Sequence, residues 1–337
     1  MERIRKLLRH VRQRMVPEAR FAEITAEHFH VLDDEDQQKE LFARSVRLIE
    51  VEVHSFCNRT CWFCPNAFID RRSTTYYLDE EVYLQLLEDL RAVRYDGVFT
   101  FSRYCEPFAD EVFYARVAQA SEFLPQACIH TNSNGDYLTD ETLEKSRRAG
   151  LNRLYIQLYL AEDEPFTSGV VASLADRIRR RIPSVAFKRG RVRADWIGYT
   201  ARVEGMEVLM YARDFRSNGV NRCGLALRTN PRRVSPCLRP FTDVYVDYDG
   251  SVMPCCNLRS DYPQHVPAVL GKLDASPGAV FRVFSGEKAV RWRKGLVGFS
   301  PKPYPCDDCS FDIVPDTPPN RRRVKRVIKL FARDDPQ

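Results

Sequence analysis

Runs of apolar residues alternate with amphipathic stretches through the first two thirds of the chain. The apolar runs with the length of β-strands lie at residues 46–54, 97–102, 127–131, 153–160 and 207–213. Stretches with helical periodicity lie between them, at residues 78–93, 110–123, 139–149 and 171–181. Strands that alternate with helices of this length are typical of right-handed βαβ units. The pattern therefore predicts an α/β protein with a parallel sheet, either open or closed into a barrel.

The pattern changes after about residue 217. Asp249 and Gly250 separate two β-rich runs within residues 243–253, which is a strong hairpin signal because glycine readily adopts the positive φ of a type I′ turn. Two short helical stretches, a loop rich in proline and cysteine, and a basic tail follow. We therefore expect a basic helical segment, an α/β barrel region, a small hairpin-plus-helix domain and a basic tail, over residues 1–44, 45–216, 217–315 and 316–337.

The composition is ordinary for a globular protein, with 44% hydrophobic and 29% charged residues among 337, and it excludes a disordered or fibrous chain. No apolar run approaches the ~18–20 residues of a membrane span, and the start of the chain is too charged for a secretory signal. The net charge of +6 is too small to define a nucleic-acid-binding protein. We expect a cytoplasmic protein without a nucleic-acid partner. Its basic ends either pack on its body, bind an acidic partner or lie on a membrane surface.

Eleven cysteines are the unusual feature of this chain. Disulfide frameworks are typical of small secreted proteins with an even number of cysteines, whereas this chain is large and its number is odd. The cysteines are also clustered, with three within residues 57–64 and five within residues 237–309. Clustered thiols in a reducing compartment indicate metal or redox chemistry more often than disulfides.

The first cysteine group directly follows the predicted strand 46–54. Cys57, Cys61 and Cys64 have the spacing C-x3-C-x2-C. Three thiolates in one loop can hold three irons of a 4Fe–4S cluster and leave the fourth iron open to another ligand. A zinc site is the alternative, and it needs a further ligand from elsewhere in the chain.

This loop resembles the signature of the radical S-adenosylmethionine (SAM) enzymes, C-x3-C-x-aromatic-C, with Phe63 at the aromatic position. The resemblance implies that the three cysteines bind a 4Fe–4S cluster, that SAM chelates the open iron, and that Phe63 packs near the adenine. Reductive cleavage of SAM in this family yields a 5′-deoxyadenosyl radical, which abstracts a hydrogen atom from the substrate. The resemblance further implies a partial (β/α)6 barrel and an electron donor such as flavodoxin or ferredoxin.

Other positions match the family more loosely. Glu106 and Pro107 resemble the Glu-Pro form of the motif that binds the SAM amino group, with Cys105 in place of a glycine. A carboxylate at the end of a strand is well placed to pair with an ammonium group, and a solvated loop acid is the alternative. Asn132 lies in a turn that resembles the Thr-Asn-Gly turn of the family, with two residues inserted before Gly135, which implies a contact with the cofactor.

The predicted strand 153–160 alternates apolar residues with polar and aromatic ones. The polar set is Tyr155, Gln157 and Tyr159. A polar inner face suits a barrel that is hollow for cofactor and substrate, and we place Gln157 among the cofactor contacts. A strand edge that faces solvent is an equal alternative.

The second cysteine group combines C-x12-G-x4-C, from Cys237 to Cys255, with a later C-x2-C pair. This pattern resembles the SPASM extension, which holds auxiliary iron–sulfur clusters after many radical SAM barrels. No cysteine follows Cys309, so the resemblance implies one auxiliary 4Fe–4S cluster rather than two. The implied ligands are Cys237, Cys255, Cys306 and Cys309. Cys256 and Cys223 are alternatives for one of them, and a structural zinc is the alternative to a cluster.

These resemblances imply a radical SAM oxidoreductase that acts on a small polar metabolite in a biosynthetic pathway. A sugar, an aminocyclitol or a nucleoside is favoured because only about 45 residues precede the barrel, whereas peptide-modifying enzymes commonly carry a leader-binding module there. A ribosomal-peptide maturase, an RNA-modifying enzyme and a non-catalytic electron carrier are the alternatives. The open iron argues against the carrier, and basic residues at the chain ends rather than at the barrel mouth argue against the RNA enzyme.

Oxidation and epimerisation can both follow hydrogen abstraction. Oxidation needs an electron acceptor, and a fully ligated auxiliary cluster suits that role. Epimerisation needs a hydrogen donor such as a thiol, and Cys105 is the candidate because the resemblance places it beside SAM. We favour oxidation, since the auxiliary set is complete whereas an unligated cysteine is usually a small buried hydrophobic residue.

Overall fold

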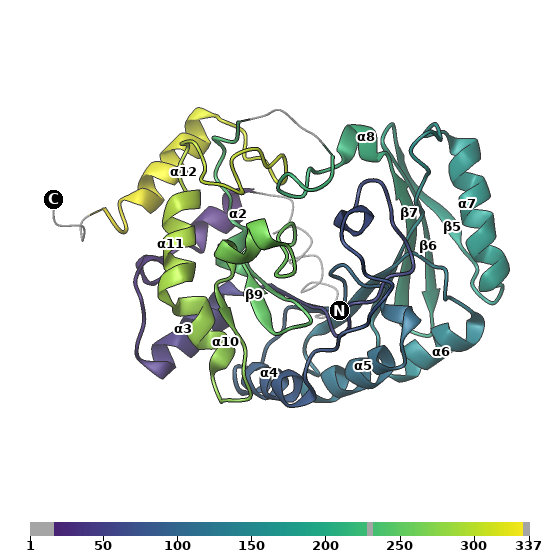
Figure 1. The fold of residues 1–337 in the computed structure, drawn as a ribbon, viewed down its shortest axis with the longest axis horizontal. Coiled ribbons are helices and arrows are strands. Elements are labelled where there is room, and N and C mark those ends of the chain that lie inside the picture. Colours follow the sequence, from purple (N-terminus) through teal and green to yellow (C-terminus); the bar gives the residue numbers. More distant parts are fainter. Residues whose placement is uncertain (1–16, 228–231, 333–337) are drawn as a thin grey trace.

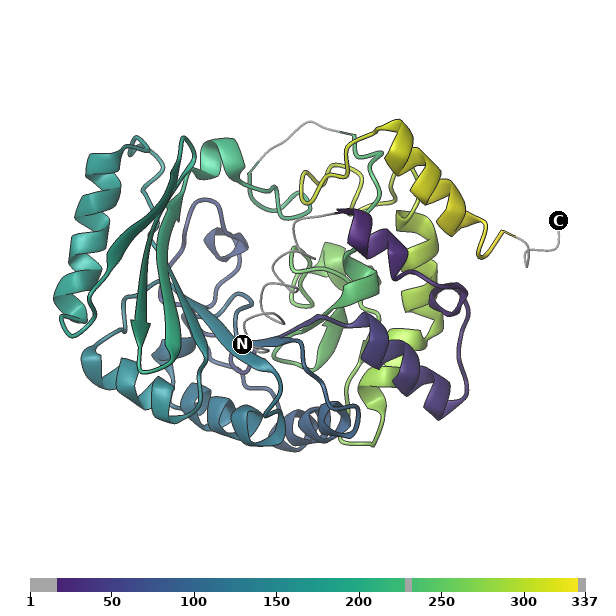
Figure 2. The same cartoon turned by 180° about the vertical axis from the view of Figure 1, so that it is seen from behind.

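The computed structural model describes residues 17–227 and 232–332, so the first part of the predicted basic segment lies outside this description. Ten strands form one sheet in the order β10-β9-β8-β1-β2-β3-β4-β7-β6-β5. In that order, the bounds are Gly271–Lys272, Ser251–Met253, Asp243–Val246, Leu48–Val51, Val98–Thr100, Cys128–Ser133, Arg153–Gln157, Met206–Arg213, Trp196–Val203 and Lys188–Arg193. The sheet curves around an inner side, toward which several connecting loops turn (Figures 1 and 2).

Six neighbouring strands, from β8 through β1, β2, β3 and β4 to β7, run parallel. Four helices lie on the outer side of the sheet (Figure 1): three connect consecutive parallel strands, and the fourth follows β4. These are α4 Glu80–Ala92, α5 Val112–Phe123, α6 Asp140–Arg148 and α7 Ser168–Arg181. The side chains of Asp79, Thr139 and Thr167 cap α4, α6 and α7 by accepting backbone hydrogen bonds. The predicted α/β fold with a parallel sheet is confirmed.

The sequence pattern does not predict β5 and β6. Five of the six residues of β5 are exposed, so this strand has no apolar face for periodicity to reveal. It pairs antiparallel with β6, and β6 pairs antiparallel with β7 across a turn at Glu204 and Gly205. The arginine-rich β5 thus forms one edge of the sheet, where charged side chains discourage pairing with another chain.

The C-terminal hairpin does not form a sheet of its own. β8 pairs in parallel with β1, placing Leu48 opposite Asp243, and β9 returns antiparallel to β8. Gly250 makes the turn with a φ of 81°, which agrees with the predicted hairpin. Because β1 and β8 are neighbours, the cysteine loop after β1 and the cysteine-rich C-terminal region lie beside each other. The domain boundaries near residues 45, 217 and 315 remain predictions.

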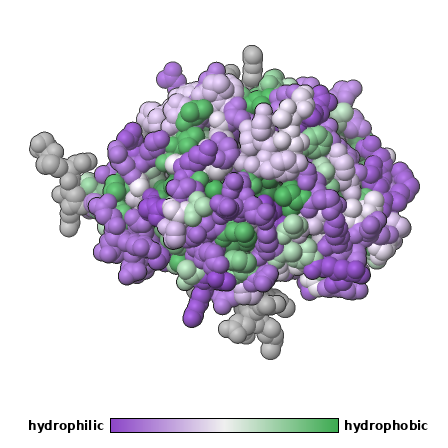
Figure 3. Space-filling view, turned by 60° about the horizontal axis from the view of Figure 1, so that its bottom comes forward, coloured by the Kyte–Doolittle hydropathy of each residue, from purple (hydrophilic) through white to green (hydrophobic). Residues whose placement is uncertain are grey.

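The remaining helices gather mainly at the β8 end of the sheet (Figure 1). They are α2 Pro17–Ala22, η1 Ala26–Phe29, α3 Glu35–Ser45, η2 Pro65–Ala67, η3 Pro107–Ala109, α8 Phe215–Asn218, α9 Arg239–Thr242, η4 Pro263–Ala268, α10 Ala279–Ser285, α11 Glu287–Leu296 and α12 Pro318–Ile328. The basic α12 buries Val324 and Val327 in an apolar cluster with Phe21, so this basic helix packs on the body of the protein. Among the described residues, no helix has the length and apolar character to cross a membrane. The face in Figure 3 is mostly hydrophilic, with smaller hydrophobic patches.

Candidate functional site

The first cysteine loop, residues 55–77, follows β1 and lies on the inner side of the sheet (Figure 1). The buried Arg71 fixes its base by donating to Glu52 Oε1 at 3.1 Å and to the Ser55 carbonyl at 3.0 Å. The Arg71 carbonyl in turn accepts a hydrogen bond from the Cys57 N–H at 3.1 Å. The loop is therefore tied to the end of the strand from which it emerges.

Burial changes the acidity of thiols in this loop. It raises the pKa of Cys57 to about 11 and the pKa of Cys61 to about 12. Such thiols are protonated at neutral pH unless a nearby positive charge stabilises the thiolate. The iron ions of a cluster would provide that charge, and three thiols in one loop are the donors that such a cluster needs.

The turn after β3 holds the cysteine loop from the side. Asp136 accepts two hydrogen bonds from Arg59, at 2.7 Å from Nε and 2.6 Å from the terminal nitrogen, and one from Asn58 Nδ2 at 2.7 Å. Asn134 Nδ2 donates to Asn58 Oδ1 at 2.8 Å. The sequence does not reveal that the cysteine loop and this turn contact each other, because the bonded residues are nearly 80 positions apart. The only local signal is the turn dipeptide Asn134-Gly135 after a strand.

Phe63 is buried and stacks on Phe215, with ring centroids 3.5 Å apart and ring planes 5° apart. The Tyr159 ring lies 5.0 Å from that of Phe63, measured between centroids. Phe215 begins α8 directly after β7, and no sequence pattern distinguishes this single aromatic residue. The aromatic position of the motif is thus part of a larger aromatic group built from three segments.

Glu106 is buried, with only 2% of its surface exposed, which excludes the solvated loop acid. Its Oε1 accepts from the Ser133 hydroxyl at 2.7 Å and from the Phe108 N–H at 3.4 Å, and its Oε2 accepts from the Asn134 N–H at 2.7 Å. Burial nevertheless raises the pKa of Glu106 to about 7. Because a carboxylate has about four acceptor positions, one position is left for a further donor.

The other predicted contacts lie on neighbouring strands and on the loop before Glu106. Asn132, on β3, donates its backbone N–H to the Ser102 hydroxyl at 3.0 Å. Gln157 ends β4 opposite Tyr211 of β7. Since β4 lies between two strands, the alternative of a solvent-facing sheet edge is excluded. Burial raises the pKa of the Cys105 thiol, and the nearby carboxylates of Glu52 and Glu106 act in the same direction.

The segment after β2 links the two cysteine regions. The Tyr104 N–H donates to Glu52 Oε1 at 2.9 Å, and its hydroxyl donates to the Cys256 carbonyl at 2.8 Å. Arg103 Nε donates to Asp247 Oδ1 at 2.7 Å. One short segment therefore contacts both the base of the first cysteine loop and the hairpin region of the second group.

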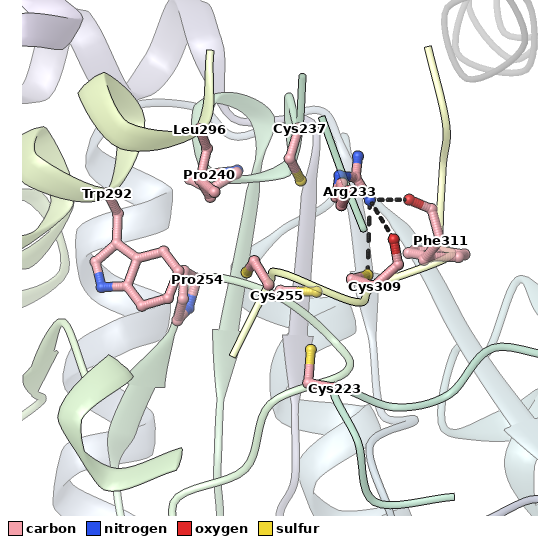
Figure 4. Close-up of a pocket in the computed structure, with 11 residues that line it drawn as sticks. Cys223, Arg233, Cys237, Pro240, Pro254, Cys255, Trp292, Leu296, Cys309 and Phe311 are labelled. Atoms are coloured by element: carbon pink, nitrogen blue, oxygen red, sulfur yellow. Dashed lines mark hydrogen bonds between the residues drawn. The ribbon is translucent and has the colours of Figure 1, made fainter. Parts of the chain in front are cut away.

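The second cysteine group lines one pocket, which Figure 4 shows in close-up. All four cysteines of the predicted ligand set contribute to the lining, and so does Cys223: the thiols are those of Cys223, Cys237, Cys255, Cys306 and Cys309. The other walls are mainly apolar and consist of Pro240, Pro254, Trp292, Leu296 and Phe311 beside Arg233. Cys255 rather than its neighbour Cys256 belongs to this lining.

Hydrogen bonds and burial affect the sulfur atoms in this pocket. The Arg233 guanidinium donates to Cys309 Sγ at 3.6 Å, and the Asn257 N–H donates to Cys255 Sγ at 3.3 Å. Hydrogen bonding with Cys223 lowers the pKa of Cys309 to about 6, whereas burial raises the pKa of Cys237 to about 12. Within residues 17–227 and 232–332, no three His, Cys, Asp or Glu side chains could together hold a single metal ion. The reason to expect an iron–sulfur cluster in this pocket is therefore that five unbridged thiols, most of them buried, line it together.

Family models match both cysteine regions. Residues 51–190 match the radical SAM superfamily, and residues 237–310 match SPASM, an iron–sulfur cluster-binding domain. The first match contains the cysteine loop and Glu106, and the second contains the four predicted auxiliary ligands.

A curated relative and a solved structure are also similar to this chain. The S-adenosyl-L-methionine-dependent 2-deoxy-scyllo-inosamine dehydrogenase of Niallia circulans is 32% identical over 135 residues, which are 40% of this chain and 53% of the relative. The match thus spans about half the length of that relative. The crystal structure of BtrN in complex with AdoMet and 2-DOIA has a TM-score of 0.55 and 24% identity, over 79% of this chain and 94% of that chain. This likeness supports the fold.

Proposed function

Since the chain carries a radical SAM domain over residues 51–190 and an iron–sulfur cluster-binding domain over residues 237–310, we propose that it is a dehydrogenase that oxidises an aminocyclitol or a related small polar metabolite. The two domain matches confirm the predicted family and the predicted cofactor types, SAM and iron–sulfur clusters. The observation that carries the proposal is the link through Tyr104, whose carbonyl accepts a hydrogen bond from Asn66 of the first cysteine loop and whose hydroxyl donates to the Cys256 carbonyl. Two neighbouring clusters suit an oxidation, because the electron that leaves the substrate needs an acceptor within the protein.

We assign the SAM-binding cluster to Cys57, Cys61 and Cys64. Their spacing in a loop at the end of β1, on the inner side of the sheet, supports this assignment. We assign one auxiliary cluster to the predicted set Cys237, Cys255, Cys306 and Cys309. Four thiolates from the chain leave no iron open, which suits electron transfer rather than binding of SAM.

When bound, SAM and its cluster would supply the means of hydrogen abstraction from the substrate, and the auxiliary cluster would supply a one-electron acceptor. The residues of the chain bind and orient these groups. The Glu106 carboxylate pairs with the SAM ammonium group, and Phe63, which is stacked on Phe215, packs near the adenine. Asn132 and Gln157 are proposed as further contacts from the adjacent strands β3 and β4.

The substrate class rests on the partial relative, whose name specifies a dehydrogenase of 2-deoxy-scyllo-inosamine. We propose that an external one-electron donor such as flavodoxin or ferredoxin reduces the SAM-binding cluster. We also propose a cytoplasmic location, because all eleven cysteines are unbridged and a reducing compartment keeps them so.

Anaerobic turnover with a panel of aminocyclitols and sugars tests this function. The expected product is two mass units lighter than the substrate, with one 5′-deoxyadenosine formed per product. Failure of the whole panel, together with oxidation of a peptide substrate, would instead support a ribosomal-peptide maturase.

An epimerase is the second candidate, and the position of Cys105 next to the buried Glu106 favours it. An epimerase returns a hydrogen atom to the opposite face of the substrate radical. In an epimerisation, the product would have the mass of the substrate when the reaction runs in H2O, and it would carry one deuterium when the reaction runs in D2O. If these results are obtained and the Cys105→Ala variant forms no such product, the reaction is an epimerisation and not an oxidation.

Replacement of Glu106 is expected to weaken SAM binding by about 1.5–3 kcal/mol, because Glu106→Gln keeps the shape and removes the charge opposite the ammonium. The pKa of about 7 adds a pH dependence. Glu106 is neutral below this pH and ionised above it, so wild-type SAM affinity should rise between about pH 6 and about pH 8. Calorimetric titration of SAM into the reconstituted protein measures both effects.

Glu111→Gln is the matched control, because this nearby acid is largely exposed. The control should bind SAM as the wild type does at each pH. If Glu106→Gln retains wild-type affinity and the same pH dependence, Glu106 does not bind SAM and serves only to hold the turn after β3.

A further inference from the structure

The auxiliary pocket contains one thiol more than a 4Fe–4S cluster requires. Cys223 lines the same pocket as the four proposed ligands, and only 4% of it is exposed. In Figure 4 its sulfur points from below toward the other sulfurs, while Cys237 enters from above. A cubane cluster accepts four thiolates, so the fifth thiol needs another role.

The backbone around Cys223 is held in an uncommon conformation. Arg222, Cys223 and Gly224 have consecutive positive φ angles of 52°, 53° and 84°. The left-handed region is sparsely populated by residues other than glycine, so it persists only where surrounding contacts enforce it. Asn221 Nδ2 provides one such contact by donating to the Asp308 carbonyl at 2.9 Å. This bond ties the turn to the loop that carries Cys306 and Cys309, and so fixes the Cys223 thiol beside them.

The place of Cys223 along the chain differs from that of the proposed ligands. All four proposed ligands lie within residues 237–310, which match the iron–sulfur cluster-binding domain, whereas Cys223 precedes this match. Its thiol nevertheless lines the pocket together with those of Cys306 and Cys309. Because four thiolates already fill the four irons of a cubane, a fifth thiol in the same pocket fits a place beside the cluster rather than on it.

We propose that Cys223 keeps its S–H group and donates a hydrogen bond to the ligating sulfur of Cys306 or Cys309, which raises the reduction potential of the auxiliary cluster. The proposal rests on the auxiliary cluster of the proposed function. A hydrogen bond to a ligating sulfur withdraws electron density from it, and this stabilises the reduced form of the cluster, which carries the extra negative charge. The Arg233 guanidinium, 3.6 Å from Cys309 Sγ, acts on the same side of the pocket and in the same direction.

This role connects the fifth thiol to the type of reaction. A higher potential makes the auxiliary cluster a better acceptor for the electron that the substrate radical loses. Cys223 would then be a positioning residue for oxidation, because it contacts the ligands of the acceptor and acts through them.

The test measures the reduction potential of the auxiliary cluster in a protein that lacks the first cluster. In the Cys57→Ala/Cys61→Ala/Cys64→Ala parent, only the auxiliary cluster should form, with about four irons per chain. Cys223→Ala and Cys223→Ser are introduced into this parent, and reductive titrations are followed by absorbance and electron paramagnetic resonance. Cys223→Ala should keep the iron content and shift the potential to more negative values. Cys223→Ser should stay close to the parent, because a hydroxyl group also donates a hydrogen bond.

Two further variants serve as a control and as a substitute for Cys223→Ala. Cys128→Ala removes a thiol on β3, away from the pocket, and should leave the potential unchanged. If Cys223→Ala does not fold, Cys223→Gly removes the same donor and suits the left-handed backbone.

An unchanged potential in Cys223→Ala, at full iron content, would overturn the hydrogen-bond role and leave the auxiliary cluster in place. Loss of iron from both Cys223→Ala and Cys223→Ser would overturn it in a different way, by making Cys223 a ligand. A parent that binds no iron would remove the auxiliary cluster itself, and thereby both this inference and the proposed function.

Discussion

Replacing Cys57, Cys61 and Cys64 together with alanine is expected to lower the iron content of the reconstituted protein from about eight to about four per chain. Cleavage of SAM should fall to background, because the open iron that binds it belongs to this cluster. The second pocket draws its thiols from other segments, so its iron should remain. Anaerobic reconstitution with iron and sulfide, followed by iron analysis and a 5′-deoxyadenosine assay, measures both effects.

Cys128→Ala is the matched control, since it removes a thiol that belongs to neither proposed ligand set. It should keep both the iron content and SAM cleavage. Unchanged iron in the triple variant would contradict the assignment of the first loop. Loss of all iron would mean that the two cysteine regions do not assemble independently.

Replacing Cys306 and Cys309 with alanine is expected to separate SAM cleavage from substrate oxidation. The iron content should again fall to about four per chain, because two of the four ligands are removed. The first loop keeps its cluster, so 5′-deoxyadenosine should still form. The oxidised product should fall to background, because the substrate radical has lost its electron acceptor. The ratio of 5′-deoxyadenosine to product, measured by mass spectrometry, should therefore rise well above one.

Cys256→Ala is the control for this pair, because Cys256 is adjacent to a proposed ligand and lies outside the lining of the pocket. It should keep both iron and coupled turnover. If the double variant still oxidises substrate at the wild-type rate, the second site is not the electron acceptor. Recovery of zinc instead of iron from the wild-type pocket would make it a structural site.

Local sequence patterns determine the main strands and helices and the first cysteine group. The helix at residues 80–92 and the strand at residues 206–213 follow from periodicity, because the side of an element that faces the core repeats along the chain. Gly250 predicts the hairpin turn because the turn requires a positive φ at this position, and glycine adopts a positive φ whatever its distant neighbours are. The sequence pattern does not reveal β5, because nearly all of its residues are exposed and its position depends on pairing with β6.

The cysteine spacings alone indicate which thiols group together, because a loop of eight residues or a short hairpin can bring its own cysteines together. The partners of these loops come from distant parts of the chain and depend on the order of the strands. The pairing of β8 with β1 brings the two cysteine regions side by side, and Tyr104 then contacts Asn66 in the first region and Cys256 in the second. The same packing buries Glu106 under the turn after β3 and adds Cys223 to the second pocket. The sequence by itself therefore determined the elements and the two thiol groups, whereas only the tertiary structure decided what surrounds them, because burial and hydrogen bonding are set by neighbours that are remote along the chain.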